Sequence, residues 1–421
     1  MMNLKDASVL VWDRGLFLSF ALRLARNGFG KVYYFNDWQR SGRPSFNELA
    51  VGTGFDGVEP VTKAWPLIDH VDCIAFPDCY DGDLQAWFRD NGYNVWGSGE
   101  GGELEIYRKY WKDVIKALGL TVAPYEHITG IAALRKYVQG TKDVYVKISR
   151  MRGLMETHHI FDYETGKPWL DKKEFELGPL SEETSFIVEK KVDTKLEIAG
   201  DTIFVGAFPE YAINGVEIKD CCYAGMVQNY TELPDHILNV NRALAPVLSR
   251  YNYSNFLAIE LRIDKKDRAH PIDPCCRQAS PAGEAQLATW TNFPEVVYWG
   301  SRGKLVQPEF DDGYVVESMI YSNDDERDWL AVRVPEEIRH CLNLYFGMRR
   351  GRLDWRVPQP KPFEEVGSLT VTGKSFDDAI GKLRKMAEQV EGDVIVKTDS
   401  LEDAVKEFDL MKKKGMSVVP A

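Results

Sequence analysis

The sequence predicts an α/β fold in its first hundred residues and an α+β fold in the remainder. Over residues 8–97, short apolar runs typical of buried parallel strands alternate with segments of helical spacing. This alternation indicates a small doubly wound unit. Residues 195–212 and 256–275 have the alternating character of antiparallel strands. At 421 residues, the chain is long enough for two or three domains.

The first part of the chain is expected to contain short strands and two helices. The strands are expected at residues 8–13, 31–36, 73–78 and 94–97, and the helices at 17–30 and 83–93. After the first strand the chain reads WDRGLF and lacks the GxGxxG pattern, so a dinucleotide site is not expected there. We place this first domain at residues 1–103.

The remaining elements divide between a central and a C-terminal domain, which we place at residues 104–310 and 311–421. The central elements are an amphipathic helix at 104–118, an extended segment at 121–128, a helix at 131–140 and strands at 143–150 and 185–192. In the C-terminal domain, residues 367–390 predict a strand, a turn and a helix with Ser375 as its N-cap. Ser400 begins a second helix in the same way.

Composition excludes several classes of protein. The net charge of −12 argues against a general nucleic-acid binder, which needs clustered Lys and Arg. No apolar stretch reaches the length of a membrane span, and the N-terminus does not resemble a secretory signal. A cytoplasmic location is therefore expected. The seven cysteines include no CxxC pair, which favours reduced structural thiols over a zinc site or a disulfide framework.

Residues 256–283 carry the most informative pattern of the chain, because they read as two strands joined by a polar turn. The apolar residues of the first strand alternate with polar ones, so Glu260 lies on the face opposite the apolar side chains. Pairing about the turn brings Glu260 close to Asp273. Two neighbouring carboxylates repel each other unless a cation lies between them, and such oxygen ligands suit magnesium. Arg277 is able to hold a phosphate. The alternative is an ordinary solvated hairpin edge.

Basic residues at two other places fit a site for an anion. Lys147 stands in a strand pattern, where lysine is costly to bury unless it meets an anion; the alternative is a lysine at a sheet edge. Ser149 and Arg150 follow in the segment SRMRG, which suits a loop that covers a phosphate. Arg108 and Lys112 lie four residues apart on a helix, so they either point into one cleft or form a solvated face.

In their chain order, these segments resemble those of the ATP-grasp superfamily. The order is a basic helix ending in glycine, a strand with a lysine, a loop, a strand ending in Glu-Lys, an acidic residue, two carboxylates and an arginine. The chain is similar to glycinamide ribonucleotide synthetase (phosphoribosylamine–glycine ligase), since IDPCCRQA stands where that family has a segment like IEFNCRFG. The resemblance implies an ATP-grasp fold with an N-terminal pre-ATP-grasp domain, a lid over residues 140–200 and a small C-terminal α+β domain.

The resemblance also implies roles for individual residues. Residues that match the family's ATP contacts are Arg108, Lys147, Ser149, Arg150, Glu189, Lys190, Lys191, Val192 and Glu197. Among them, Lys147 contacts the phosphates, the segment 189–192 holds adenine through backbone groups, and Glu197 accepts a hydrogen bond from the ribose. Glu260 and Asp273 match the Mg²⁺ carboxylates, with Mn²⁺ as the alternative ion. Arg277, together with Lys147, matches the groups that stabilise the transferred phosphate.

Three departures from the family pattern bear on the substrate. The loop after Lys147 has one glycine where the family's loop is glycine-rich, and Cys275 replaces a metal-binding asparagine. The turn that resembles GGREHA and serves phosphoribosylamine in the family is missing near the N-terminus. The resemblance therefore implies that the nucleotide half of the site is kept and that the acceptor has changed.

The expected activity is an ATP- and Mg²⁺-dependent ligase that activates a carboxylate as an acyl phosphate and joins it to an amine. Both substrates are expected to be small molecules, and the protein is expected to be a monomer or a homodimer. One alternative is an ATP-grasp kinase or other phosphotransferase. Another is a catalytically silent ATP-binding scaffold subunit, which Cys275 and the poor glycine loop favour and the retained charged residues oppose.

Overall fold

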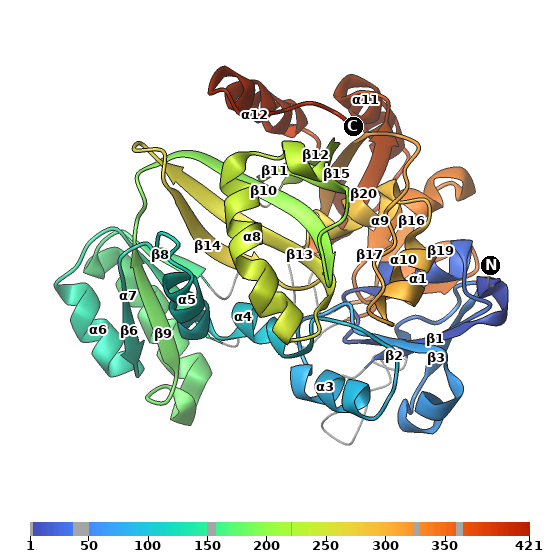
Figure 1. The fold of residues 1–421 in the computed structure, drawn as a ribbon, viewed down its shortest axis with the longest axis horizontal. Helices are drawn as coiled ribbons and strands as arrows, with labels where there is room; N and C mark the ends of the chain where they lie inside the picture. Colours follow the sequence, from blue (N-terminus) through green and yellow to red (C-terminus); the bar gives the residue numbers. More distant parts are fainter. Residues whose placement is uncertain (1–2, 37–49, 150–156, 220, 323–327, 359–364) are drawn as a thin grey trace.

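The computed structural model describes residues 3–36, 50–149, 157–219, 221–322, 328–358 and 365–421. Figure 1 shows a large central sheet with a smaller sheet group beside it at one end and the N-terminal sheet at the other. The mixed α/β composition predicted from the sequence is confirmed. Within the described parts of the chain, no helix combines the length and the apolar character that crossing a membrane requires.

The N-terminal sheet is parallel throughout, with the strand order β3-β2-β1-β4-β5. Its strands are β1 (Ser8–Asp13), β2 (Lys31–Asn36), β3 (Val58–Val61), β4 (Cys73–Ala75) and β5 (Val95–Trp96). Val9 and Val11 of β1 pack with α1 (Leu18–Asn27), whereas Leu10 and Trp12 belong to a separate cluster with α3 (Gly82–Asp90). Because successive β1 side chains point to opposite faces, the two helices cover opposite sides, as a doubly wound unit requires.

The single helix predicted at residues 104–118 is wrong, because the segment is not one continuous helix. The segment 104–118 forms two helices, α4 (Glu103–Ile106) and α5 (Arg108–Ala117), which meet at Tyr107. Tyr107 has φ −106° and ψ 92°, an extended conformation that interrupts the helical hydrogen bonds. The amphipathic spacing of the segment did not reveal this break, which reorients α5 relative to α4.

The lid predicted over residues 140–200 corresponds in part to a separate sheet of four antiparallel strands, since the residues from Thr194 onward belong to the central sheet. The separate sheet has the order β6-β9-β7-β8, with β6 (Tyr125–Thr129), β7 (Val144–Ile148), β8 (Thr157–Ile160) and β9 (Ser185–Lys190). The helices α6 (Ile131–Gln139) and α7 (Tyr163–Leu177) pack on it and share one apolar core with it. We refer to this unit, residues 125–149 and 157–190, as the lid sheet.

The central sheet has the order β14-β13-β10-β11-β12-β15-β20-β17, and β22 also pairs with β15. Its strands are β10 (Thr194–Val205), β11 (Tyr211–Ile218), β12 (Cys222–Asn229), β13 (Ser254–Asp264), β14 (Ala269–Cys275), β15 (Tyr314–Ser322), β17 (Leu342–Leu344), β20 (Glu365–Gly373) and β22 (Val394–Val396). Strands from both sides of the expected boundary at residue 310 therefore lie in one sheet. A smaller sheet adjoins it, with β16 (Leu330–Arg333), β18 (Gly347–Arg350), β19 (Leu353–Arg356) and β21 (Glu391–Gly392).

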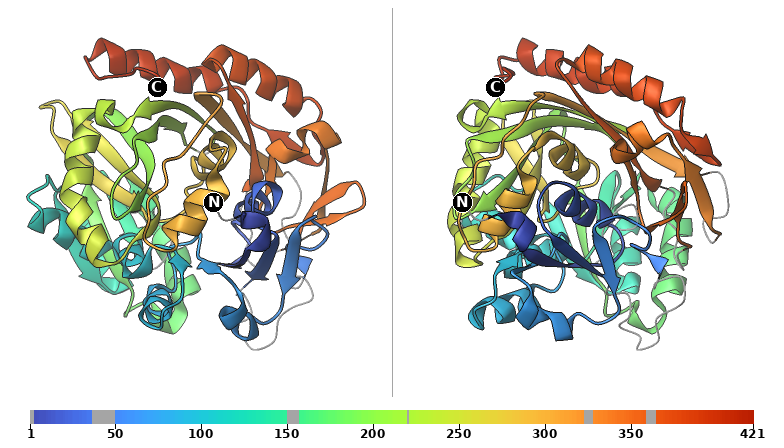
Figure 2. Two further views of the ribbon diagram at one scale, coloured as in Figure 1. Left: turned by 45° about the vertical axis from the view of Figure 1, so that its right-hand side comes forward. Right: turned by 90° about the vertical axis from the view of Figure 1, so that its right-hand side faces the viewer.

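Helices cover both faces of the central sheet. One apolar core contains buried residues of α8 (Asp235–Arg250), α11 (Phe376–Ala387) and α12 (Leu401–Lys413). On the other side lie α9 (Gly283–Thr289) and α10 (Phe293–Gly300), which contact α1 of the N-terminal sheet. Figure 2 shows α11 and α12 in red along the outer face and the N-terminal sheet in blue on the opposite side.

The helix starts predicted in the C-terminal part differ in their capping. The Ser375 side chain accepts a hydrogen bond from the backbone N–H of Asp378, which confirms it as the N-cap of α11. Ser400 occupies the N-cap position of α12, but its side chain makes no capping bond. Both serines therefore occupy the predicted N-cap position, and only the Ser375 side chain makes the capping hydrogen bond.

Candidate active site

A cavity of about 420 Å³ lies between the lid sheet and the central sheet. Its walls come from β7 and β9 on the lid side, from β10, β11, β13 and β14 on the central sheet, and from the start of α5. These elements are far apart in sequence, so the cavity exists only when the two sheets face each other. The volume falls within the range of small-molecule sites.

The hairpin of β13 and β14 brings the two predicted carboxylates to the cavity wall. Residues 258–263 alternate between partly exposed and buried, and Glu260 lies on the partly exposed face as the period of two predicted. Ile259 pairs with Pro274 and Leu261 with Pro271, so the register shifts around Glu260. Such a bulge places two residues of one strand against one of the other. Glu260 thus faces Asp273 across the bulge.

Asp273 is held by two buried cations. The Lys147 Nζ lies 2.8 Å from Asp273 Oδ2, and the Arg108 Nη1 lies 2.6 Å from Asp273 Oδ1. Burial opposes ionisation of Asp273, but Lys147 and Arg108 outweigh it and lower its pKa below the ordinary value. The alternative of an edge-strand lysine is wrong for Lys147, because this side chain is buried in the cleft.

The buried carboxylate of Glu189 completes the charged cluster. Lys147 Nζ lies 2.9 Å from Glu189 Oε2, and Lys112 pairs with the other oxygen of Glu189. Burial lowers the pKa of Lys112, whereas Lys147 and Lys112 together lower the pKa of Glu189 against its own burial. Arg108 and Lys112 both reach this cluster, so they do not form a solvated face. We call Arg108, Lys112, Lys147, Glu189 and Asp273 the charged cluster.

Glu260 lies beside this cluster, and the positive charge near it does not compensate its burial and its acidic neighbours. Burial and then repulsion from Asp273 and Glu197 raise the pKa of Glu260 well above its ordinary value. Arg262, two residues along the same strand, approaches Glu260 and Glu197 at 3.4 Å each. A cation between Glu260 and Asp273 would relieve the repulsion, and two carboxylates with open space for phosphates match the ligands that Mg²⁺ prefers. The donor set therefore fits the magnesium ion expected from the sequence.

Arg277 lies in the cavity wall and is oriented by a residue that sequence reasoning missed. Its Nε lies 2.8 Å from Glu105 Oε1 on α4, and the backbone N–H of Cys276 donates to Glu105 Oε2 at 2.7 Å. Glu105 is far from both in sequence, and no local pattern could reveal this contact. Arg262 was also missed, although its place two residues after Glu260 signals the same strand face.

The predicted nucleotide contacts are brought together only in part. Among the described residues that line the cavity are Arg108, Lys147, Glu189, Lys190, Val192 and Glu197, together with the metal and phosphate candidates Glu260, Asp273 and Arg277. Ser149 and Lys191 are outside that described lining, and the Ser149 backbone N–H donates to Ser185 O at the start of β9. Arg150 lies outside the described residues. The Glu189 side chain belongs to the charged cluster.

The arrangement of a lid sheet facing a central antiparallel sheet, beside a parallel N-terminal sheet, is the ATP-grasp fold. Phosphoribosylamine–glycine ligase from Thermotoga maritima is similar to this chain with a TM-score of 0.69 at 16% identity, covering 93% of this chain and 99% of that one. The biotin carboxylase domain of 2-oxoglutarate carboxylase from Hydrogenobacter thermophilus has a TM-score of 0.67 at 13% identity, covering 96% and 95%. An ADP complex of N5-carboxyaminoimidazole ribonucleotide synthetase has a TM-score of 0.61 at 14% identity, covering 90% and 96%. No protein-family model and no curated protein matches the sequence.

Proposed function

We propose that the protein is an ATP- and Mg²⁺-dependent ligase that joins a carboxylate to an amine through an acyl phosphate. The observation that carries this proposal is the charged cluster beside Glu260, in a cavity between two sheets. Two of the similar structures are complexes with ADP, and one of these also contains magnesium. We infer that this chain uses the cavity for ATP.

The residues of the cavity suit the stabilisation of transferred phosphate. Lys147 and Arg108 are held on Asp273, close to where the phosphates of a nucleotide would lie. Glu260 and Asp273 would hold Mg²⁺, which supplies charge neutralisation for the phosphate oxygens. Lys147 and Arg277 would stabilise the negative charge that develops on the phosphoryl group.

The proposed reaction has two steps. A substrate carboxylate oxygen attacks the γ-phosphorus of ATP, the bond to the β-phosphate oxygen breaks, and ADP leaves. The amine then attacks the acyl carbon, phosphate departs with the bonding electrons, and the nitrogen loses one proton to the departing phosphate. The cleft serves both steps by holding the reacting groups together and limiting hydrolysis of the acyl phosphate.

The turn between β1 and α1 supports a change of acceptor relative to phosphoribosylamine. Asp13 Oδ2 accepts hydrogen bonds from the backbone N–H groups of Gly15 and Phe17 and from Tyr34, so the turn is tied to its own strand. Phe346 fills the space beside Gly15, where an added Cβ would come within 2.4 Å of the ring. A turn filled in this way leaves little room for a sugar phosphate.

Release of ADP tests the proposal. Native protein would be incubated with ATP, Mg²⁺ and pools of carboxylates and amines, beside Lys147→Met and the exposed control Lys142→Met. We expect ADP release in at least one pool, which Lys147→Met abolishes and Lys142→Met retains. Absence of ATP binding by native protein in calorimetry would overturn the proposal.

A nucleotide-binding subunit without catalysis is the second candidate. Cys275 favours it, because the thiol stands where the family has a metal-binding asparagine, and its Sγ approaches the Arg277 carbonyl oxygen at 3.7 Å. This candidate predicts Mg²⁺-dependent ATP binding with no ADP release in any pool. A phosphotransferase would instead release ADP and yield a phosphorylated product without an amide, which mass spectrometry of the products distinguishes.

A further inference from the structure

Asp201 of β10 is a buried carboxylate in the wall of the cleft, and the reaction described above assigns it no role. Ala199 and Asp201 both line the cleft, whereas Gly200 between them turns to the other face of the sheet. A Cβ added at Gly200 would lie 2.7 Å from the side chain of Ile237 on α8, which covers that other face. Because successive residues of a strand point to opposite faces, the Asp201 side chain points into the cleft.

The position of Asp201 along β10 places it beyond the proposed metal site. Glu197 is the candidate ribose contact, and Ala199 pairs with Glu260 on β13. Asp201 follows two residues further along the strand, about 7 Å from Ala199. A nucleotide with its ribose at Glu197 and its phosphates at Glu260 would leave the cleft beside Asp201 free for the acceptor.

A tyrosine from two strands away holds the Asp201 side chain. The strands β10, β11 and β12 lie side by side in the central sheet (Figure 1), and the Tyr223 hydroxyl of β12 donates to Asp201 Oδ2 at 2.6 Å. The tyrosine crosses β11 at Gly215, where an added Cβ would clash with its hydroxyl, and Gly225 leaves room for the ring in the same way. Burial and then Asp201 raise the pKa of Tyr223 well above its ordinary value, so this hydroxyl stays a donor.

The other oxygen of Asp201 is left for a ligand. Asp201 is 3% exposed, and within the described part of the chain no group donates to its Oδ1, which stays open to the cleft. Burial raises the pKa of Asp201 to about 6, and the Tyr223 hydrogen bond opposes this rise, so the carboxylate is mostly ionised at neutral pH. Buried charges are normally paired, so a cation would complete this group.

The charged groups around Asp201 do not supply that cation. On or beside the neighbouring strands, these groups are Glu217, Lys219, Glu260, Arg262 and Glu317. Arg262 pairs with Glu197 and Glu260, and Lys219 is exposed. Burial raises the pKa of Glu317 to about 8, so this acid is mostly protonated at neutral pH. Among the described residues, no lysine or arginine acts on the pKa of Asp201.

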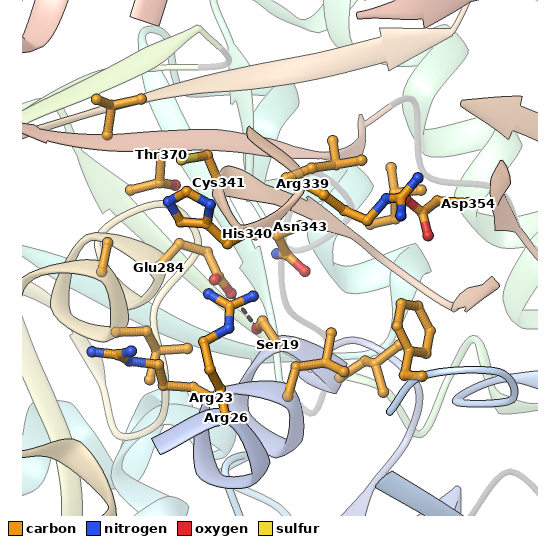
Figure 3. A pocket seen from close by; sticks show the side chains of 18 of the residues that line it. Ser19, Arg23, Arg26, Glu284, Arg339, His340, Cys341, Asn343, Asp354 and Thr370 are labelled. Atoms are coloured by element: carbon orange, nitrogen blue, oxygen red, sulfur yellow. Dashed lines mark hydrogen bonds and ion pairs between the residues drawn. The ribbon is translucent and has the colours of Figure 1, made fainter. Parts of the chain in front are cut away.

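An equally buried aspartate elsewhere in the chain is paired with cations. Asp354 is also 3% exposed and lines a separate cavity between α1 and β20 (Figure 3). Arg339, labelled beside it in the figure, and Arg349 form ion pairs with Asp354 at 3.2 and 2.6 Å. At Asp201, by contrast, the described residues provide only an uncharged hydroxyl.

We propose that Asp201 binds the acceptor of the ligase as a cationic primary amine and accepts a proton from its nitrogen. The ammonium group meets Asp201 Oδ1, and Tyr223 is the positioning residue that holds the carboxylate. The inference rests on the proposed ligase function and deepens it, because it specifies the charged form of the acceptor. The acceptor class is an alkyl amine rather than an alcohol, a thiol or an aromatic amine, which are uncharged at neutral pH.

The proton transfers balance with the two steps of the proposed reaction. The ammonium group gives one proton to Asp201 Oδ1 and becomes a neutral amine with a free electron pair. This pair attacks the acyl carbon, the bond to the phosphate oxygen breaks, and the second proton leaves the nitrogen with the departing phosphate. Asp201 then releases its proton to water. General-base catalysis of this kind accelerates a reaction by about 10²–10⁴-fold.

Two nucleophiles of different charge test the role of Asp201. Native protein would be incubated with ATP, Mg²⁺ and the carboxylate pools, with either hydroxylamine or primary alkyl amines as the acceptor. Hydroxylamine is largely uncharged at neutral pH, and it traps an acyl phosphate as a hydroxamate without a base. We expect Asp201→Asn to lower kcat/KM for the alkyl amine at least about hundredfold and to change hydroxamate formation by less than about threefold. The control Asp90→Asn changes an exposed aspartate of α3 outside the described lining and should leave both rates within about twofold.

A pH profile separates proton transfer from a structural role. Tyr223→Phe removes the hydrogen bond that opposes the rise in the pKa of Asp201. The acid limb of kcat/KM for the alkyl amine should therefore move to higher pH than in native protein, while the acid limb for hydroxylamine stays in place. If Asp201→Asn does not fold, this profile decides alone.

The outcomes distinguish the role of Asp201 from the ligase function itself. If native protein forms neither hydroxamate nor amide, the ligase function is overturned and this inference with it. Hydroxamate formation with equal amide rates in native protein and Asp201→Asn would overturn only the role of Asp201. That role is also overturned if Asp201→Asn, folded by circular dichroism, loses both products, or if the acid limb of Tyr223→Phe does not move.

Discussion

Replacing Lys147 with methionine should destabilise the folded protein, because Lys147 is the buried cation that the carboxylates of Glu189 and Asp273 share. Its Nζ lies 2.9 Å from Glu189 and 2.8 Å from Asp273. Removing one member of a buried ion pair costs about 3–5 kcal/mol, since a charge stays buried without compensation. Lys112 still pairs with Glu189 and Arg108 with Asp273, so we expect the lower end, about 3 kcal/mol.

Urea denaturation followed by circular dichroism measures this loss, with Lys142→Met as the control. Lys142 is exposed, so its substitution should change the free energy of unfolding by less than about 0.5 kcal/mol. The loss should also depend on pH. The folded-state pKa values of Asp273 and Glu189 are lowered, so their stabilisation is present above the ordinary values of 3.8 and 4.5 and is lost as the pH falls through the folded-state values.

The difference between native protein and Lys147→Met should therefore be largest near neutral pH and shrink in acid. A loss below about 1 kcal/mol at pH 7 would show that water or rearranged side chains replace the lysine, and the reasoning from the buried pairs would be refuted. A difference that grows in acid would refute it equally, because protonated carboxylates do not need the cation.

Three further predictions concern other parts of the molecule. Glu260→Gln and Asp273→Asn should each abolish Mg²⁺-dependent ADP release with an unchanged circular dichroism spectrum; activity in either variant would remove that carboxylate from the site. Gly15→Ala should lower the free energy of unfolding by about 1–3 kcal/mol in urea, because Gly15 has φ +95° and faces Phe346, and an unchanged midpoint would contradict this packing. Burial raises the pKa of Glu284 from 4.5 to about 7, so native stability should fall as the pH rises between these values and Glu284→Gln should lose this component of the slope; equal slopes would disprove it.

Local patterns in the sequence were sufficient to predict many of the strands and helices and one pair of site residues. The alternation along 256–263 and the polar turn after it placed Glu260 and Asp273 face to face, because a hairpin is a local structure with a period of two. The sequence pattern of residues 143–150 likewise predicted the strand that contains Lys147. The ATP-grasp fold was implied by the resemblance of these ordered segments to that superfamily, and the structural similarities confirm the fold.

Contacts between distant segments could be learned only from the folded chain. The pairing of Glu105 with Arg277, the sharing of Asp273 by Arg108 and Lys147, and the break at Tyr107 all depend on how separate elements pack. Periodicity reports which face of one element is apolar, and it carries no information about which other element that face meets.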